Sequence, residues 1–135
     1  MGRGAVSWPP RPGSTPPAMR KPISPRTHGL LDYATVAVFA LAPVAFGLEG
    51  LAAGLSYGLA AVHLAMTLGT AFPMGVVRVV SFPGHGAVEL AVGVALLLAA
   101  FFLFSGAAFW FYAVMGLVIL TVWAGTDYAG RGALT

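Results

Sequence analysis

The longest uncharged stretch of the chain limits the fold most strongly. Residues 90–126, 37 in all, contain no Asp, Glu, Lys or Arg. As a single α-helix this stretch would be about 55 Å long, whereas the hydrocarbon core of a bilayer is roughly 30 Å thick. One helix of that length cannot remain in lipid, so the stretch must fold back on itself. Ser105-Gly106 is the natural break, which predicts membrane-spanning helices at about 86–104 and 107–126.

The first half of the chain predicts two more spanning helices, at about 29–48 and 51–72, separated by a short polar turn at Glu49. Hydrophobic residues make up 59% of the chain and charged residues 8%, against about a quarter charged in soluble domains. The chain has no cysteine, which excludes disulfides and thiolate metal ligands. The fold class is therefore expected to be all-α, a polytopic membrane four-helix bundle with the lipid bilayer as its surroundings.

The charged residues predict the orientation of the bundle. Residues 1–27 hold five of the seven Lys and Arg and seven of the ten prolines, which predicts a disordered, basic tail. The transmembrane domain is expected at 28–128 and a short second tail at 129–135. Four spans place all seven basic residues on one side, so the positive-inside rule predicts that both termini are cytoplasmic. A basic tail beside hydrophobic spans favours anionic lipid over nucleic acid as its partner.

A short motif occurs twice, as His-Gly-Leu-Leu-Asp at 28–32 and His-Gly-Ala-Val-Glu at 85–89. The copies are 57 residues apart, and each begins a pair of predicted spans. This spacing predicts two parallel two-helix repeats, related by an axis along the membrane normal. In each copy the histidine and the acid are four residues apart, and therefore share one face of a helix.

The motif supplies the candidate polar cluster: His28, Asp32, His85 and Glu89. If the first and third spans are neighbours, these four side chains converge. Imidazole and carboxylate together suit a zinc, manganese or iron site, and also a proton relay. A structural role is the simplest alternative. The acids would then complement the dipoles of the first helical turns, with Arg26 or Arg78 neutralising them.

The second span carries two distinct faces. Small residues, which allow close packing of another helix from this bundle or from a second copy, line one face: Gly50, Gly54, Gly58, Ala61, Ala65 and Gly69. Intramembrane polar residues lie opposite: Ser56, His63, Thr67 and Thr70. An ionisable residue such as His63 in the membrane raises a functional hypothesis, and a neutral histidine bonded within the bundle is the structural alternative.

The chain contains no glycine-rich phosphate loop, nucleophile elbow or catalytic triad pattern, so no catalytic residue, metal or cofactor is assigned. The leading expectation is a membrane protein that is not an enzyme and acts as a structural or accessory bundle, self-associating or part of a larger complex. The alternative is a proton- or cation-handling protein that uses the polar cluster. A metal- or haem-binding oxidoreductase subunit is the third possibility; for haem, His63 is expected to lie too deep to pair with His28 or His85.

Several motifs taken in order resemble the small bacterial SPW-repeat membrane proteins. They are the segment 28–33 (HGLLDY), then 42–47 (APVAFG), 70–78 (TAFPMGVVR) and 85–89 (HGAVE). The Ser-Pro-Trp signature itself is replaced by Ala-Pro-Val at 42–44 and by Ala-Ala-Phe at 99–101. The resemblance implies two-helix repeats in the bacterial inner membrane, with no established activity and no catalytic residues.

Overall fold

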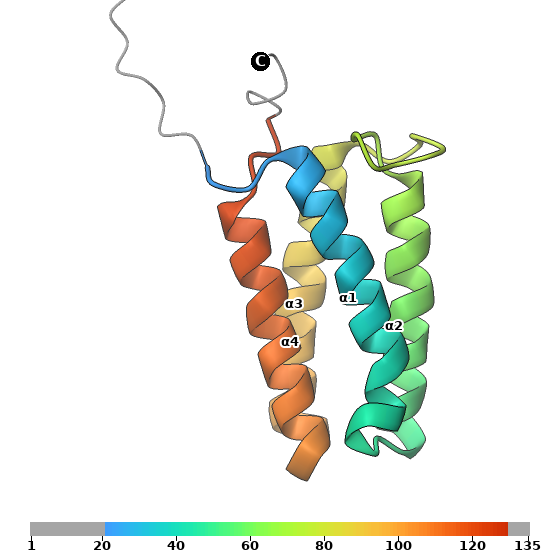
Figure 1. The fold of residues 1–135 in the computed structure, drawn as a ribbon. Coiled ribbons are helices and arrows are strands. Elements are labelled where there is room, and N and C mark those ends of the chain that lie inside the picture. Colours follow the sequence, from blue (N-terminus) through green and yellow to red (C-terminus); the bar gives the residue numbers. More distant parts are fainter. Residues whose placement is uncertain (1–20, 130–135) are drawn as a thin grey trace, which may run out of the picture.

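The computed structural model describes residues 21–129 and contains four helices. They are α1 (Pro25–Phe46), α2 (Gly50–Gly69), α3 (Phe82–Leu103) and α4 (Gly106–Gly125), with no strand in the described part. Helix α1 packs along α2, and α3 along α4, and the two hairpins stand side by side (Figure 1). Both ends of the described chain and the α2–α3 connection lie at the same end of the bundle. The prediction of an all-α helical bundle is confirmed.

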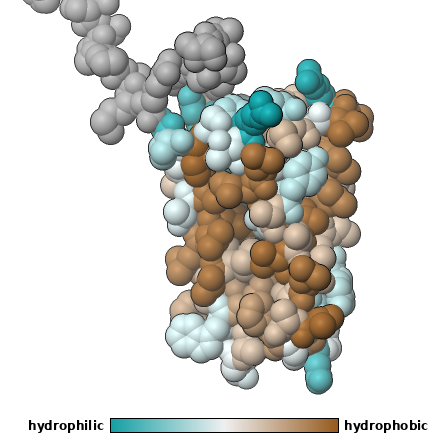
Figure 2. All heavy atoms as spheres, viewed as in Figure 1, coloured by the Kyte–Doolittle hydropathy of each residue, from teal (hydrophilic) through white to brown (hydrophobic). Residues whose placement is uncertain are grey.

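All four helices are long and apolar enough to span a membrane. Large apolar side chains point away from the bundle, for example Val44, which is 82% exposed, and Phe102, which is 80% exposed. Figure 2 shows apolar residues along the visible side of the bundle and the most hydrophilic residues at its two ends. Such a surface is suited to lipid rather than water. The chain therefore has the character of a multi-pass membrane protein.

The helices that carry the repeated motif begin four residues earlier than predicted. Ser24 caps α1 by accepting a hydrogen bond from the backbone N–H of Thr27 (3.2 Å), with Pro25 in the first turn. Ser81 caps α3 in the same way, through the N–H of Gly84 (3.1 Å). A serine followed closely by proline is a strong helix start, because serine satisfies a free N–H and proline needs none.

The expected tail at 1–27 extends too far along the chain, because its last residues belong to the bundle. Ile23 donates its backbone N–H to Gly125 O (3.0 Å) and accepts from the N–H of Asp127 (3.1 Å), so the segment before α1 is paired with the segment after α4. Residues 1–20 and 130–135, which include most of both expected tails, lie outside the described residues. The predicted break at Ser105-Gly106 is confirmed, since α3 ends at Leu103 and α4 begins at Gly106.

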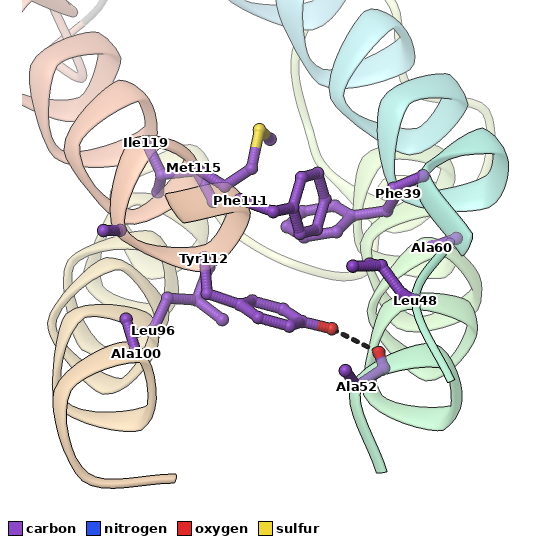
Figure 3. Packing of buried hydrophobic residues seen from close by; sticks show 12 residues of the cluster. Phe39, Leu48, Ala52, Ala60, Leu96, Ala100, Phe111, Tyr112, Met115 and Ile119 are labelled. Atoms are coloured by element: carbon purple, nitrogen blue, oxygen red, sulfur yellow. Dashed lines mark hydrogen bonds between the residues drawn. The ribbon is translucent and has the colours of Figure 1, made fainter. Parts of the chain in front are cut away.

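The apolar core lies in the half of the bundle away from the chain ends. Phe39 and Phe111 meet edge to face across the two hairpins, with ring centroids 5.8 Å apart. Tyr112 is fully buried, and its hydroxyl donates to the backbone oxygen of Ala52 at 2.6 Å (Figure 3). These contacts join α4 of the second hairpin to α1 and α2 of the first.

The small-residue face of α2 is turned away from the bundle. Five of its six members are exposed, and only Gly69 is buried. A methyl group added at Gly50, Gly54 or Gly58 would meet no atom of the described chain within 4 Å. Helix α2 instead buries Ala52, Ser56 and Ala60 among its residues. Of the two packing partners considered for this face, a helix of the same bundle is therefore wrong for the five exposed members, and Gly69 faces Val79 and Val80 of the α2–α3 connection.

Candidate functional site

The four residues of the repeated motif do converge, between α1 and α3. Nε2 of His28 lies 3.4 Å from Asp32 Oδ1 and 3.3 Å from Glu89 Oε2. Nε2 of His85 lies 3.4 Å from Asp32 Oδ2 and 3.7 Å from Glu89 Oε1. Each imidazole thus faces one oxygen of each carboxylate, and histidines and acids alternate around a closed ring. One potential ligand atom from each of the four residues lies within 4.8 Å of the other three.

His63 of α2 belongs to the same group, which corrects the expectation that it lies too deep. Its Nε2 is 3.5 Å from Asp32 Oδ1, and its ring centroid is 6.1 Å from that of His85. The error came from the helix ends: α2 ends three residues earlier than predicted and α1 begins four residues earlier. At 1.5 Å per residue, those seven residues remove about 10 Å of the supposed difference in depth. We refer to His28, Asp32, His63, His85 and Glu89 as the His/carboxylate cluster.

Two threonines orient the histidines of the motif. His28 Nδ1 is 2.9 Å from the hydroxyl of Thr126, which itself donates to Val122 O at 2.7 Å. A threonine has only one hydroxyl proton, so Thr126 must accept the Nδ1–H of His28. In the neutral imidazole, the lone pair is then on Nε2 and faces the two acids. We assign this tautomer from the hydrogen bonds.

His85 has the same arrangement. Its Nδ1 is 2.8 Å from the hydroxyl of Thr70, and that hydroxyl donates to Met66 O at 2.6 Å. In both cases the threonine ends a helix of the other hairpin: Thr70 follows α2 and orients a histidine of α3, while Thr126 follows α4 and orients one of α1. In both histidines, Nε2 points into the cluster. The orientation of each ring is therefore determined by a contact between the hairpins.

The interior of the cluster is buried and incompletely hydrogen-bonded. His28, Asp32, His85 and Glu89 are each 5% exposed or less. Four of the cluster's buried atoms have no hydrogen-bond partner within residues 21–129: Nε2 of His28, His63 and His85, and Oδ2 of Asp32. Unpartnered buried polar atoms are costly, and here they point toward one another. This convergence marks the cluster as the candidate functional site.

Two features of the expected structural role are wrong. Neither α1 nor α3 has an acidic residue in its first turn, because both helices begin earlier than predicted and place Asp32 and Glu89 in later turns. The dipole effect falls off within the first turn, so it does not stabilise these acids. Within residues 21–129, ion pairs of both acids are made with histidines, and neither Arg26 nor Arg78 is among them.

Aromatic rings cover the cluster on the side of the chain ends. Phe82 lies 5.2 Å from the His28 ring and Tyr128 lies 5.5 Å from it, between ring centroids, and Phe72 stacks on Phe82 at 5.5 Å. The Tyr128 hydroxyl also donates to Glu89 Oε2 at 2.5 Å. Burial, and after it the bond to Glu89, raise the pKa of Tyr128 well above 10, so this hydroxyl keeps its proton.

The glycines of the motif make room for this cover. A Cβ on Gly86 would lie 2.6 Å from Tyr128 Cε1, and a Cβ on Gly29 would lie 2.5 Å from Phe72 Cε2. Real Cβ atoms do not approach other atoms so closely. The His-Gly pair of each motif therefore combines a ligand-type side chain with a position where an aromatic ring rests on the helix backbone.

A small cavity of about 30 Å³ reaches the cluster from the side, between α2, α3 and α4. His63, His85 and Glu89 contribute polar groups to its wall, and apolar residues such as Leu59, Met66 and Val92 form the rest. The volume suits one or two water molecules. It is far too small for a porphyrin, and the rings of His28 and His85 are only 5.4 Å apart, so haem does not fit between them.

The other predicted polar residues of α2 do not all join the cluster. Thr70 does, through His85, whereas Ser56 donates to Phe39 O at 2.6 Å and Thr67 to His63 O at 2.8 Å. Thr126 and Tyr128 were not predicted as site residues. A signal for them exists in the sequence: Gly-Thr followed by an aromatic two residues later occurs at 69–72 and again at 125–128.

Comparisons with known proteins add no relative. No family model matches the chain, and neither a curated protein nor a solved structure matches it.

Proposed function

We propose that this chain is a multi-pass protein of the bacterial cell membrane that takes up a cation in the His/carboxylate cluster. It holds this cation between its hairpins as a structural or accessory component and is not an enzyme. The observation that carries the proposal is the convergence of four buried, unpartnered ring-nitrogen and carboxylate atoms on one space. No hydrogen bond in the described part of the chain satisfies these atoms, and a cation bound among them would.

The charge of the cluster supports the same conclusion. Asp32 and Glu89 bring two negative charges into a buried site, and the pairs they form are with histidines, which are neutral unless protonated. Two uncompensated carboxylates in a membrane protein are strongly unfavourable. Positive charge of up to two units, as protons or as a metal ion, removes this cost. The tyrosine hydroxyl of Tyr128 stabilises Glu89 but adds no charge.

The packing beyond the cluster favours a held cation over one that crosses the membrane. The core on the far side of the cluster is apolar and includes Phe39, Leu96 and Phe111. The polar groups buried there, such as Ser56, are bonded to backbone oxygens of the bundle. Liposomes that contain the protein should therefore be as tight to protons as empty liposomes. A proton flux that depends on Glu89 would instead establish the conducting alternative.

Several further features belong to the proposal. The basic residues of the sequence favour cytoplasmic termini, because the α2–α3 connection, which contains Arg78, lies at the same end of the bundle as both ends of the described chain. The exposed small-residue face of α2 favours self-association or a membrane partner. The equivalent serine caps, threonine bonds and glycine contacts of the two hairpins support two parallel repeats, and with them the resemblance to SPW-repeat proteins.

A thermal-unfolding experiment tests the proposal. The full chain in detergent is unfolded at increasing concentrations of Na⁺, K⁺, Mg²⁺, Ca²⁺, Mn²⁺ and Zn²⁺, and at a series of pH values. A cation that binds only the folded state adds about 2.7 kcal/mol to the free energy of unfolding when its concentration is 100 times its Kd. We expect at least one cation, or the proton, to raise the midpoint of the wild type, and this rise to be absent in the Asp32→Asn/Glu89→Gln double variant.

Glu49→Gln is the matched control, because Glu49 is an exposed carboxylate at the opposite end of the bundle. The Glu49→Gln variant should show the same rise of the unfolding midpoint as the wild type. If wild type and double variant respond equally to every cation and to pH, the cluster does not hold a cation and the proposal is wrong.

A further inference from the structure

We propose that the cation is one divalent first-row metal ion such as Zn²⁺, bound by Nε2 of His28 and His85 and by one oxygen each of Asp32 and Glu89. This inference rests on the proposed function and narrows it, since a proton would also satisfy the latter. It assigns the occupant, its ligands and the residues that position them.

The spacing of the cluster fits a metal ion better than direct hydrogen bonds. Hydrogen bonds between a charged nitrogen and a carboxylate are about 2.7–2.9 Å long, whereas each nitrogen here lies 3.3–3.7 Å from the nearer oxygen of each carboxylate, and the two nitrogens face different oxygens. Ligands bound tetrahedrally at about 2.1 Å are about 3.4 Å from each other. The largest separation of the four ligand atoms, 4.8 Å, requires an inward movement of about 0.7 Å by each of the two atoms concerned.

The donor atoms select the class of metal. Two imidazole nitrogens with two carboxylates suit Zn²⁺, Fe²⁺, Co²⁺ or Mn²⁺, whereas Ca²⁺ and Mg²⁺ prefer oxygen ligands throughout. A divalent ion also balances the two negative charges of Asp32 and Glu89, which leaves the buried site neutral with its histidines uncharged. Monovalent Na⁺ or K⁺ would leave one charge uncompensated.

Thr70 and Thr126 act as positioning residues for this metal. Each accepts the Nδ1–H of a histidine and so leaves the Nε2 lone pair free toward the cluster. Hydrogen bonds to the second nitrogen of a metal-binding histidine typically contribute 10- to 100-fold in affinity. The Tyr128 hydroxyl positions Glu89 instead by donating a hydrogen bond to its Oε2.

His63 and the cavity beside it mark the accessible side of the metal. His63 is the most exposed member of the cluster, at 12% of its side chain, and among the described residues the acid paired with its Nε2 is Asp32, at 3.5 Å. The cavity joins it to the space between α2 and α3. We therefore place His63, or a water in the cavity, at a fifth and exchangeable position, so that loss of His63 weakens binding less than loss of His85.

The test measures Zn²⁺ binding to the tag-free full chain in detergent by equilibrium dialysis with elemental analysis. Absorption of bound Co²⁺ reports the ligand set. We expect one Zn²⁺ per chain, and Glu89→Gln should lose at least 100-fold in affinity. Thr126→Val should lose about 10- to 100-fold, and Thr126→Ser, which keeps the hydroxyl, should restore it.

Thr121→Val is the matched control. Thr121 on α4 makes the same type of bond to a backbone oxygen, with Leu117 at 2.7 Å, but it is exposed and bonded to no histidine. The Zn²⁺ affinity of the Thr121→Val variant should stay within twofold of the wild type. Helix content measured by circular dichroism verifies that every variant is folded.

The outcomes separate this inference from the proposed function. If the wild type binds no stoichiometric Zn²⁺ or Co²⁺ but its unfolding still responds to pH through Asp32 and Glu89, the metal is wrong and the cation site remains. Equal Zn²⁺ binding by wild type and Glu89→Gln would place the metal elsewhere and overturn the inference. Equal losses in Thr126→Val and Thr121→Val would overturn the positioning role of Thr126.

Discussion

Gly86→Ala is expected to destabilise the protein although it adds a single methyl group to a helix. The new Cβ would lie 2.6, 2.7 and 2.9 Å from three atoms of the Tyr128 ring, where ordinary contact is about 3.4–4 Å. The ring must therefore move by about 1 Å. Overpacking of this kind costs about 1–3 kcal/mol.

The displaced ring also carries the hydroxyl that donates to Glu89, and a hydrogen bond to a charged group contributes about 1.5–3 kcal/mol. In the opposite direction, alanine gains about 1 kcal/mol over glycine in a helix interior. We expect a net loss of about 2–4 kcal/mol in the free energy of unfolding. The measurement is unfolding in mixed detergent and SDS, followed by circular dichroism.

Gly54→Ala is the matched control. Gly54 is also a helical glycine, but nothing lies within 4 Å of the added methyl. Only the helix propensity changes there, so this variant should be as stable as the wild type or up to about 1 kcal/mol more stable. The two substitutions are thus predicted to have opposite signs.

A double-mutant cycle isolates the cause. In a Tyr128→Ala background the ring is absent. Gly86→Ala should then leave the free energy of unfolding unchanged or raise it slightly, through the higher helix propensity of alanine. The reasoning is refuted if Gly86→Ala stabilises the wild type as Gly54→Ala does, or if it costs as much without the Tyr128 ring as with it.

Three further predictions concern contacts around the cluster and on the surface. Tyr128→Phe should lower the free energy of unfolding by about 1.5–3 kcal/mol and weaken Zn²⁺ binding, because it removes a donor from a buried carboxylate. Tyr112→Phe removes the bond to Ala52 O between the hairpins and should cost about 1 kcal/mol while leaving Zn²⁺ affinity unchanged, which distinguishes core packing from the site. Gly58→Leu should reduce energy transfer between labelled copies in liposomes, with little change in unfolding, because Gly58 is exposed on the small-residue face.

The number and kind of helices could be predicted because hydropathy decides them. The uncharged stretch at 90–126 is too long for one span, and its break at Ser105-Gly106 is where α3 gives way to α4. The helix starts could not be predicted from hydropathy, since Ser24-Pro25 resembles the proline-rich tail before it. The capping hydrogen bond of Ser24 overrides that composition and extends α1 by a turn.

The His and acid residues of the candidate site were predicted from the sequence, whereas the residues that position them, Thr126 and Tyr128, were not. A histidine and an acid four residues apart must share a helix face, whatever the rest of the fold does. That Thr126 approaches His28 depends on the end of α4 lying beside the start of α1, and these residues are 98 positions apart. Periodicity carries no information on such a contact. The prediction of the depth of His63 was wrong for a related reason, because it required helix ends that are correct to within one turn.

The positions of Thr70 and Thr126 link the site to the assembly of the bundle. Each histidine of the repeated motif is oriented by a threonine from the opposite hairpin, so neither is correctly set in a hairpin on its own. The acids follow the same rule: Asp32 of α1 faces His85 of α3, and Glu89 of α3 faces His28 of α1. The geometry of the cluster therefore depends on docking of the hairpins, and by linkage a cation that binds only the docked state would favour docking. Each His-Gly-x-x-acid turn therefore forms half of the cluster. Its glycine leaves room for an aromatic ring, and a threonine of the other hairpin orients its histidine.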